Sequence, residues 1–161
     1  INEILPKALK ELRETERPLV LHQSGEKHLE KTLAEYQLLG VDATVVPFIK
    51  DMAEAYATAD LVLCRSGALT VAELCAAGIG AILVPYPFAV DDHQTTNGNF
   101  MAKNGAAILI QQKDLTVEKL THLLKDFSEH REKCLKMAVA AYHLRETDSV
   151  TRVLTICEEV L

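Results

Sequence analysis

The sequence predicts an α/β fold in which a Rossmann-like parallel sheet carries helices on both faces. Short, nearly continuous apolar segments alternate with amphipathic segments, and glycines follow two of the amphipathic segments directly. Strands of this apolar kind are buried on both sides, as in parallel sheets whose connections are helices. The chain has 161 residues, of which 48% are hydrophobic, so we expect residues 1–161 to form one domain with a substantial core.

The elements follow in order from a helix near residue 1, where apolar residues recur at helical spacing as far as Leu12. We expect strands at 19–21, 43–46, 61–64, 81–84 and 106–110, with helices at 26–39, 51–59, 68–77 and 93–103. Gly40 and Gly78 end two of these helices, a position where glycine adopts the left-handed conformation without strain. From Thr116 the pattern is helical to the end, with breaks near 127–128 and 146–149, and we expect these helices to cover the sheet.

Composition excludes several classes of function. The formal charge is −6, with Lys and Arg scattered among acidic residues, which argues against a nucleic-acid partner. The longest apolar stretch, residues 74–90, is interrupted by glycines and prolines and is not a membrane span, and we see no signal peptide. The four cysteines lack paired spacing and the Asp91–His93 run lacks further ligands, so we expect free thiols in a reducing cytoplasm and no metal.

Polar or glycine-rich loops follow four of the predicted strands, at residues 22–25, 47–52, 65–70 and 85–94. In open parallel sheets, ligands bind just beyond the carboxyl ends of the strands. We therefore expect these four loops to line one binding edge.

The loop at 65–70 is the most informative of the four. Ser66 and Gly67 permit a tight turn from strand to helix, after which the amides of Ala68, Leu69 and Thr70 would point outward at the positive end of the helix dipole. Free amides at a helix start form an anion site. The pattern therefore predicts a phosphate-binding turn.

Glu73 lies one turn further along this helix and has two interpretations. Its carboxylate could accept hydrogen bonds from the paired hydroxyls of a ribose. Thr70 and Glu73 also match the T-x-x-E capping box, in which the glutamate only satisfies backbone amides at the helix start. Spacing alone leaves both roles open, and the two can coexist.

Other polar residues carry weaker signals. His22 and His93 have no nucleophile or orienting acid at a diagnostic spacing, so we expect both to be surface loop histidines. Gln94 and Asn97 lie three residues apart and would share a helix face whose amides could bind sugar hydroxyls. The alternative for residues 97–99 is an exposed turn.

Residues 48–53, 59–73, 84–87, 92–97 and 105–107 resemble the carboxyl-terminal domain of the MurG family. These bacterial transferases add N-acetylglucosamine (GlcNAc) to lipid I, giving lipid II in peptidoglycan synthesis, and so serve cell wall biogenesis, cell shape and cell division. The resemblance implies the two-domain GT-B fold, in which the carboxyl-terminal half binds the donor UDP-GlcNAc and the amino-terminal half binds the lipid acceptor.

Carried over by position, the resemblance also implies the substrate contacts. The backbone of Ile49 would pair with uracil, and Met52 would pack near the base. Within the segment Ala68, Leu69, Thr70, Val71, Ala72, Glu73, the first three residues would hold the diphosphate and Glu73 would take the ribose hydroxyls. Gln94, helped by His93 and Asn97, would read the GlcNAc.

The family's first strand with its glycine-serine phosphate loop, and its amino-terminal domain, have no counterpart in this sequence. The general base belongs to that missing part, so we expect no catalytic residue in this chain and no transfer by the chain alone. The resemblance further implies a reaction without metal or cofactor. Lipid I and the membrane would be contacted only through the missing domain, with the full-length protein peripheral on the cytoplasmic face of the inner membrane.

Three alternatives stay open from the residues. One is a soluble donor-binding subunit of a split lipid-linked GlcNAc transferase, and another is a lipid-galactosyl transferase of the same superfamily. The third is a non-catalytic nucleotide-sugar-binding module, which would keep the anion site without selecting a sugar.

Overall fold

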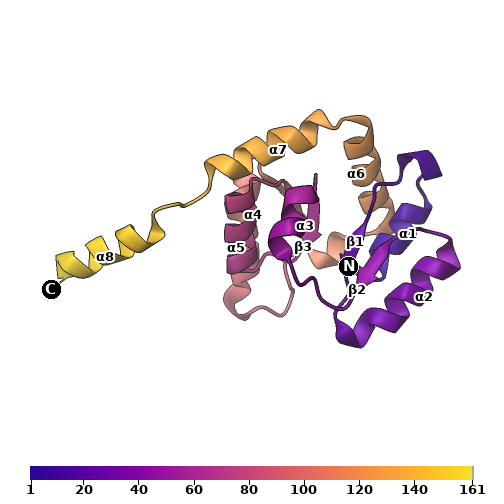
Figure 1. Cartoon of the computed structure of the whole chain (residues 1–161), viewed down its shortest axis with the longest axis horizontal. Helices are drawn as coiled ribbons and strands as arrows, with labels where there is room; N and C mark the ends of the chain where they lie inside the picture. The colour runs from indigo at the N-terminus through magenta and orange to yellow at the C-terminus, as the bar shows by residue number, and fades with distance from the viewer. Residues whose placement is uncertain (161) are drawn as a thin grey trace.

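The computed structural model describes residues 1–160, which contain five short strands in two groups (Figure 1). Strand β1 (Leu21–Gln23) pairs with β2 (Thr44–Val46). The second group has the order β3-β4-β5, formed by β3 (Val62–Cys64), β4 (Ala81–Leu83) and β5 (Ala107–Leu109). All three pairings are parallel, which confirms the predicted strand direction.

Eight α-helices precede, connect and follow the strands within this range. They are α1 (Ile4–Lys10), α2 (Leu29–Leu39), α3 (Met52–Thr58), α4 (Ala68–Ala77), α5 (His93–Lys103), α6 (Val117–Glu129), α7 (Glu132–His143) and α8 (Ser149–Val160). Short 3-10 turns lie at Glu14–Glu16, Glu26–His28, Val90–Asp92 and Gln112–Asp114. Gly40 and Gly78 end α2 and α4 with φ of 61° and 68°, the left-handed geometry expected of a helix-ending glycine.

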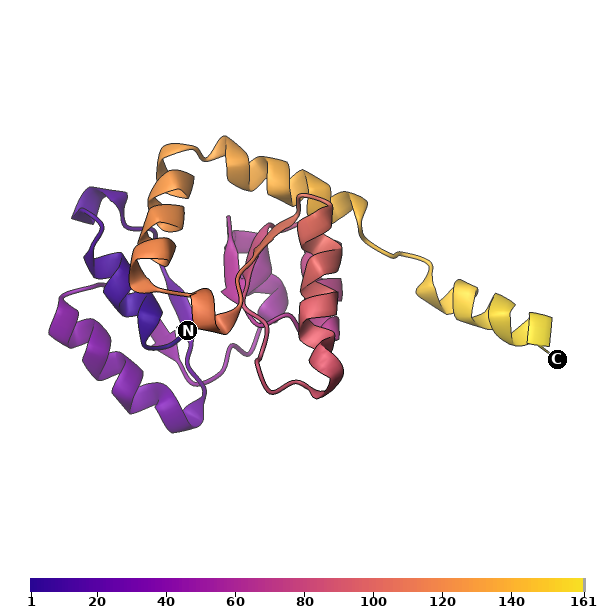
Figure 2. The same ribbon diagram turned by 180° about the vertical axis from the view of Figure 1, so that it is seen from behind.

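The central strand β4 is buried on both faces, as the apolar run predicted. Ala81 and Leu83 point into a core shared with α4, α5 and α7. Ile82 and the following Val84 point into a second core, shared with α1, α6 and α7. Helices therefore cover both faces of the β3-β4-β5 group (Figure 2), and the predicted Rossmann-like arrangement is confirmed.

The two strand groups do not meet. Among the described residues, β1 is paired only with β2, and β3 only with β4. A cleft of about 2080 Å³ separates their free edges and is lined by apolar side chains from both groups, including Leu21 and Leu63. The expected sheet is thus present as two halves with an open space between β1 and β3.

The first strand lies two residues later than predicted, at 21–23 instead of 19–21. Leu19 is fully exposed, whereas His22 is only 5% exposed. The imidazole of His22 is buried because both ring nitrogens have partners: Tyr36 Oη lies 3.0 Å from Nδ1, and Asn2 Oδ1 lies 3.1 Å from Nε2. The expectation of a surface loop histidine at position 22 is therefore wrong.

The carboxyl-terminal helices divide into two kinds. Helices α6 and α7 cover the sheet, as expected, with breaks at 130–131 and 144–148. Helix α8 instead projects away from the body of the protein (Figures 1 and 2), with its apolar side chains Val150, Val153 and Leu154 exposed. The expectation that it covers the sheet is wrong, because the 144–148 link directs the chain outward; residue 161 lies outside the described residues.

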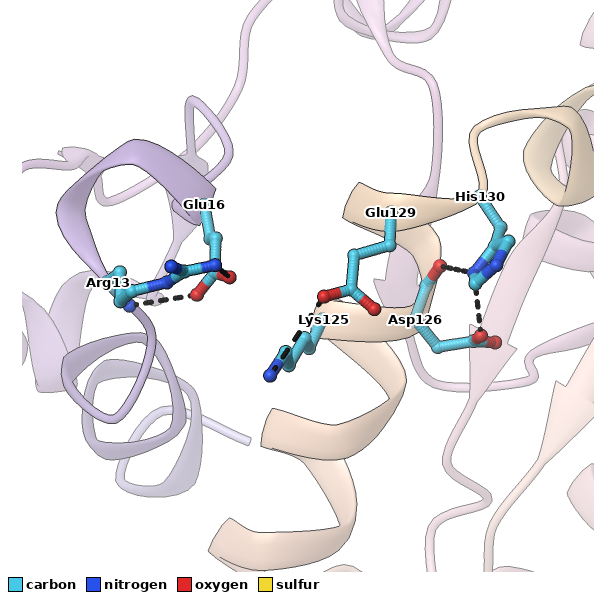
Figure 3. A network of polar contacts seen from close by, with 6 residues as sticks. All are labelled: Arg13, Glu16, Lys125, Asp126, Glu129 and His130. Carbon is cyan, nitrogen blue, oxygen red and sulfur yellow. Dashed lines mark hydrogen bonds and ion pairs between the residues drawn. The ribbon is translucent and has the colours of Figure 1, made fainter.

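Charged side chains line α6 and the turn that follows α1 (Figure 3). Arg13 pairs with Glu16 in that turn, close to Lys125 on α6, whose ammonium lies 3.9 Å from a carboxylate oxygen of Glu129. At the end of α6, Asp126 accepts hydrogen bonds from Lys133 at 2.6 Å, and these bonds hold the pKa of Asp126 below its usual range. The Asp126–Lys133 pair joins α6 to its neighbour α7.

Candidate functional site

Helix α4 begins with backbone amides that have no partner inside the helix. Its N-cap residue, Gly67, has an extended backbone with φ of −63° and ψ of 149°, and makes no side-chain cap. The first helical hydrogen bond runs from the amide of Val71 to the carbonyl oxygen of Gly67, at 2.9 Å. The amides of residues 68–70 therefore remain available at the positive end of the helix, which is the geometry of an anion site.

Glu73 does not act as a capping-box residue. Because Gly67 is the N-cap, Thr70 occupies the third position of the helix and Glu73 lies a full turn beyond the start. Its exposed carboxylate instead accepts a hydrogen bond from Tyr56 Oη, at 3.1 Å. The capping interpretation of the T-x-x-E pattern is thus wrong, and the Glu73 carboxylate stands beside the anion site.

Two residues of the predicted segment contribute less than their neighbours. The side chain of Val71 is 7% exposed and belongs to the core, and its amide is used by Gly67. Ala72 is exposed but lies within the helix, beyond the free amides. The groups that α4 offers to a ligand are the amides of residues 68–70 and the side chains of Thr70 and Glu73.

The start of α5 is joined to the start of α4 through Ser66. This serine is fully buried, and its Oγ donates a hydrogen bond to the carbonyl oxygen of Gln94 at 2.7 Å. Asn97 Nδ2 donates in return to the carbonyl oxygen of Ser66 at 3.2 Å. Residues 97–99 are helical, so the exposed-turn alternative is wrong.

Gly98 makes this close approach possible. A Cβ atom at this position would lie 2.2 Å from Leu109 Cδ1 and 3.3 Å from Ser66 Cβ. A larger residue would therefore push α5 away from the 65–67 loop. The signal was present in the sequence, since a glycine inside a helical pattern often marks a close contact.

The amide side chain of Gln94 is held at one end. Its Oε1 accepts a hydrogen bond from the amide of Tyr86 at 2.9 Å, which leaves Nε2 as the free donor. The preceding residues Asp91 and Asp92 both have φ of 50°, a left-handed conformation that is uncommon outside glycine. His93 begins α5 and is exposed beside Gln94.

Arg65 is a structural residue of this edge that the sequence analysis did not single out. Its Nη1 donates to the carbonyl oxygens of Val84 and Pro85 at 3.1 Å and 3.0 Å, and its Nη2 donates to Gln112 Oε1 at 2.6 Å. The guanidinium also lies 5.5 Å from the ring centroid of Tyr86. Arg65 thus connects the loops that follow β3, β4 and β5, and a cation directly after an apolar strand was the available signal.

Ile49 and Met52 lie on the other side of the site. The amide of Ile49 donates to Gln23 Oε1 at 2.8 Å, which joins the loop after β2 to the end of β1. Met52 is half-buried at the start of α3. Ile49, Met52 and Thr70 all line the cleft between the two strand groups, whereas the α5 residues reach the α4 start through Ser66.

Residues 1–160 contain no group of three or more His, Cys, Asp or Glu side chains that could hold a metal ion. No helix in the same part of the chain is both long and apolar enough to cross a membrane.

Comparison with known proteins gives consistent matches along the chain. The sequence model described as "Glycosyltransferase family 28 C-terminal domain" matches residues 1–153. A curated protein of Marinobacter nauticus, named UDP-N-acetylglucosamine--N-acetylmuramyl-(pentapeptide) pyrophosphoryl-undecaprenol N-acetylglucosamine transferase, is 58% identical over 158 residues, covering 98% of this chain and 44% of that protein. A protein of the same name from Paraburkholderia phymatum is 48% identical over 164 residues, covering 99% of this chain and 43% of that protein.

Two solved structures are also similar to this chain. The crystal structure of Acinetobacter baumannii MurG is similar with a TM-score of 0.89 and 42% identity, covering 98% of this chain and 47% of that chain. The glycosyltransferase VinC, in complex with dTDP, shares the fold with a TM-score of 0.67 at 15% identity, covering 98% of this chain and 37% of that chain. The chain therefore spans less than half the length of these relatives.

Proposed function

The chain belongs to the family of glycosyltransferase family 28 carboxyl-terminal domains, and from this premise we propose that it is the donor half of a transferase that moves GlcNAc from UDP-GlcNAc to lipid I. The relatives named for this reaction are more than twice as long as the match. The acceptor, lipid II formation and a place in peptidoglycan synthesis are therefore proposed for the full-length protein.

One observation carries the proposal: the free amides at the start of α4, the Glu73 carboxylate and the start of α5 lie on one connected edge. A diphosphate is the anion that suits several backbone donors at a helix start. Vicinal ribose hydroxyls suit a carboxylate one turn away. A sugar beyond the diphosphate would then meet α5, whose Gln94 carbonyl oxygen accepts a hydrogen bond from Ser66 Oγ at 2.7 Å.

We assign the residues accordingly. The amides of Ala68, Leu69 and Thr70 hold the diphosphate, and Glu73 binds the ribose. Gln94, with His93 and Asn97, recognises the GlcNAc. The backbone of Ile49 pairs with uracil beside Met52. The free carbonyl of Ile49 is the group best placed for the base, because its amide already donates to Gln23.

We further propose that one more parallel strand fills the space between β1 and β3. Both free edges carry unpaired backbone groups, which a sheet normally satisfies. Asn2 Nδ2 donates to the carbonyl oxygen of Ser24 at 2.9 Å, which places Asn2 near the carboxyl end of β1. Polypeptide preceding Ile1 would therefore reach this edge of the sheet. A strand there, joined to α1 by a loop, would add backbone donors to the diphosphate site.

The reaction we propose is an inverting displacement without a metal ion. A base outside this chain removes the proton of an acceptor hydroxyl, whose oxygen attacks the anomeric carbon while the bond to the UDP oxygen breaks. The role of α4 is to stabilise the negative charge that grows on the departing diphosphate, because its amides are already oriented. We place the full-length protein on the cytoplasmic face of the bacterial inner membrane, where acceptor and donor meet.

The proposal is tested by measuring the affinities of the full-length protein for UDP-GlcNAc, UDP-GalNAc and UDP by calorimetry. We expect UDP-GlcNAc to bind more tightly than UDP-GalNAc, and Glu73→Ala to weaken UDP binding at least about tenfold, since hydrogen bonds to a charged group contribute about 1.5–3 kcal/mol. Glu132→Ala, which removes an exposed carboxylate from α7, is the control and should bind as wild type. Equal affinity for all three ligands would indicate a nucleotide-binding module that does not select a sugar, and would overturn the transferase proposal.

A further inference from the structure

We propose that Tyr56 is a positioning residue that orients the Glu73 carboxylate for the ribose. The inference rests on the proposed function, since it concerns how Glu73 is prepared for its ligand. Tyr56 lies on α3, and its Oη is 3.1 Å from Glu73 Oε2. It is the one side chain in residues 1–160 that donates a hydrogen bond to this carboxylate.

The ring of Tyr56 is well placed to hold its hydroxyl still. It is half-buried and packs against the core cluster of α4, which includes Val71, Leu74 and Cys75. The start of α3 is itself fixed, because Asp51 Oδ1 caps the helix by accepting from the amide of Glu54 at 2.9 Å. The hydroxyl is therefore presented from a rigid support.

The direction of the hydrogen bond is also determined. A carboxylate only accepts, so Tyr56 must be the donor and must keep its proton. Burial, together with the hydrogen bond and charge of Glu73, raises the pKa of Tyr56 above its usual range. The phenol consequently remains a donor throughout the working range of pH.

One donor leaves most of the carboxylate free. Two oxygens offer about four acceptor positions, of which Tyr56 occupies one on Oε2. Oε1 and the second position of Oε2 remain for two vicinal hydroxyls. Because Glu73 is exposed on α4, its side chain would otherwise sample several rotamers, and Tyr56 restricts that freedom before the ligand arrives.

Two other roles for the same contact make different predictions. If the contact only satisfies the Tyr56 hydroxyl, its loss weakens the binding of every nucleotide equally, through the fold. If Tyr56 competes with the ribose for Glu73, its loss tightens UDP binding. A positioning role alone weakens ligands that carry the ribose diol and spares those that lack it.

The test compares UDP with 2′,3′-dideoxy-UDP, by calorimetry on the full-length protein. In the wild type, UDP should bind more tightly by a measurable ratio, which Glu73→Ala should reduce to about one. Tyr56→Phe should reduce the ratio by about two- to tenfold, the range that one net hydrogen bond gives, with unchanged affinity for the dideoxy ligand and an unchanged melting temperature. Tyr142→Phe, which removes a hydroxyl from α7 near the far end of α4, is the matched control and should keep the wild-type ratio.

The outcomes separate this inference from the proposed function. If wild type binds UDP and distinguishes it from the dideoxy ligand, but Tyr56→Phe keeps the full ratio or binds UDP more tightly, the positioning role is overturned while the donor site stands. If wild type binds neither nucleotide, the donor-site proposal fails, and the role of Tyr56 fails with it.

Discussion

Replacing Ser66 by alanine tests whether the α4 and α5 parts of the site act together. The hydroxyl is completely buried and spans 2.7 Å to the carbonyl oxygen of Gln94, 28 residues away in sequence. Ser66→Ala removes this bond without adding volume. The return bond from Asn97 to the Ser66 carbonyl oxygen stays, because it uses only the backbone of residue 66.

The magnitude follows from the single bond that is lost. A hydrogen bond within a protein contributes about 1 kcal/mol to the net free energy of unfolding. The Gln94 carbonyl lies in the first turn of α5 and keeps access to its helical partner, so the additional cost of an unsatisfied buried acceptor does not arise. We expect the free energy of unfolding to fall by about 1 kcal/mol. The ratio of UDP-GlcNAc affinity to UDP affinity should fall by no more than about fivefold, the factor that corresponds to that energy.

The assay measures UDP and UDP-GlcNAc affinities by calorimetry, with urea denaturation of the same variant. Affinity for UDP should stay unchanged, because the α4 amides and Glu73 are untouched, while the extra affinity for UDP-GlcNAc should fall. Ser128→Ala, on the exposed side of α6, should alter neither property. Equal weakening of both ligands, or no change in either, would refute the argument that Ser66 links the diphosphate and sugar subsites.

Two further predictions concern the scaffold. Gly80→Ala should destabilise the protein by about 1–3 kcal/mol in urea denaturation, because a Cβ would lie 2.6 Å from Met137 Cβ. Gly67→Ala, whose nearest new contact is at 3.7 Å, should cost no more than about 1 kcal/mol, the loss of a glycine N-cap. Burial lowers the pKa of His22, so the unfolded chain binds the proton more readily, and stability should fall as the pH drops below about 6.5. Thermal melts between pH 7.5 and 5.5 should show this loss in wild type and in the exposed-site control His28→Gln, but a smaller loss in His22→Gln; identical profiles in all three would contradict it.

The elements that the sequence predicted well are those whose signal is local. Strand β4 was predictable because residues 81–84 are continuously apolar and the strand is buried on both faces. The ends of α2 and α4 were predictable because Gly40 and Gly78 adopt the left-handed conformation that ends a helix. In each case the residues that decide the structure are adjacent in the chain.

The predictions were wrong where residues far apart in the sequence determine the local structure. Strand β1 was placed early because Leu19 is apolar, yet Leu19 is exposed, and His22 is buried through partners contributed by Tyr36 and Asn2. No pattern around residue 22 contains those partners. A polar side chain is stable in the interior when its hydrogen bonds are satisfied, and that condition is visible only in three dimensions.

The ambiguity at Glu73 has a similar cause. A T-x-x-E spacing does not say which residue is the N-cap, and the N-cap of α4 is Gly67, three residues before the threonine. The link between Ser66 and Gln94 was equally hidden, since it joins the loop after β3 to the first turn of α5, which only the parallel topology brings together. The candidate residues were therefore predictable as types, whereas their mutual support was not.

Three of the polar side chains assigned to the ligand share one arrangement, in which one atom has a hydrogen-bond partner in the protein and another remains open. Gln94 is held through Oε1 and leaves Nε2 as a donor, Asn97 is held through Nδ2 and leaves Oδ1 as an acceptor, and Glu73 is held through Oε2 and leaves Oε1 as an acceptor. Side chains fixed in this way lose little conformational freedom when a ligand binds, so more of each hydrogen bond contributes to affinity. Hydroxyls both donate and accept, and an acetamido group offers a carbonyl and an amide. The ligand we propose, with a ribose diol at Glu73 and an N-acetylated sugar at α5, would match this set of open atoms in polarity.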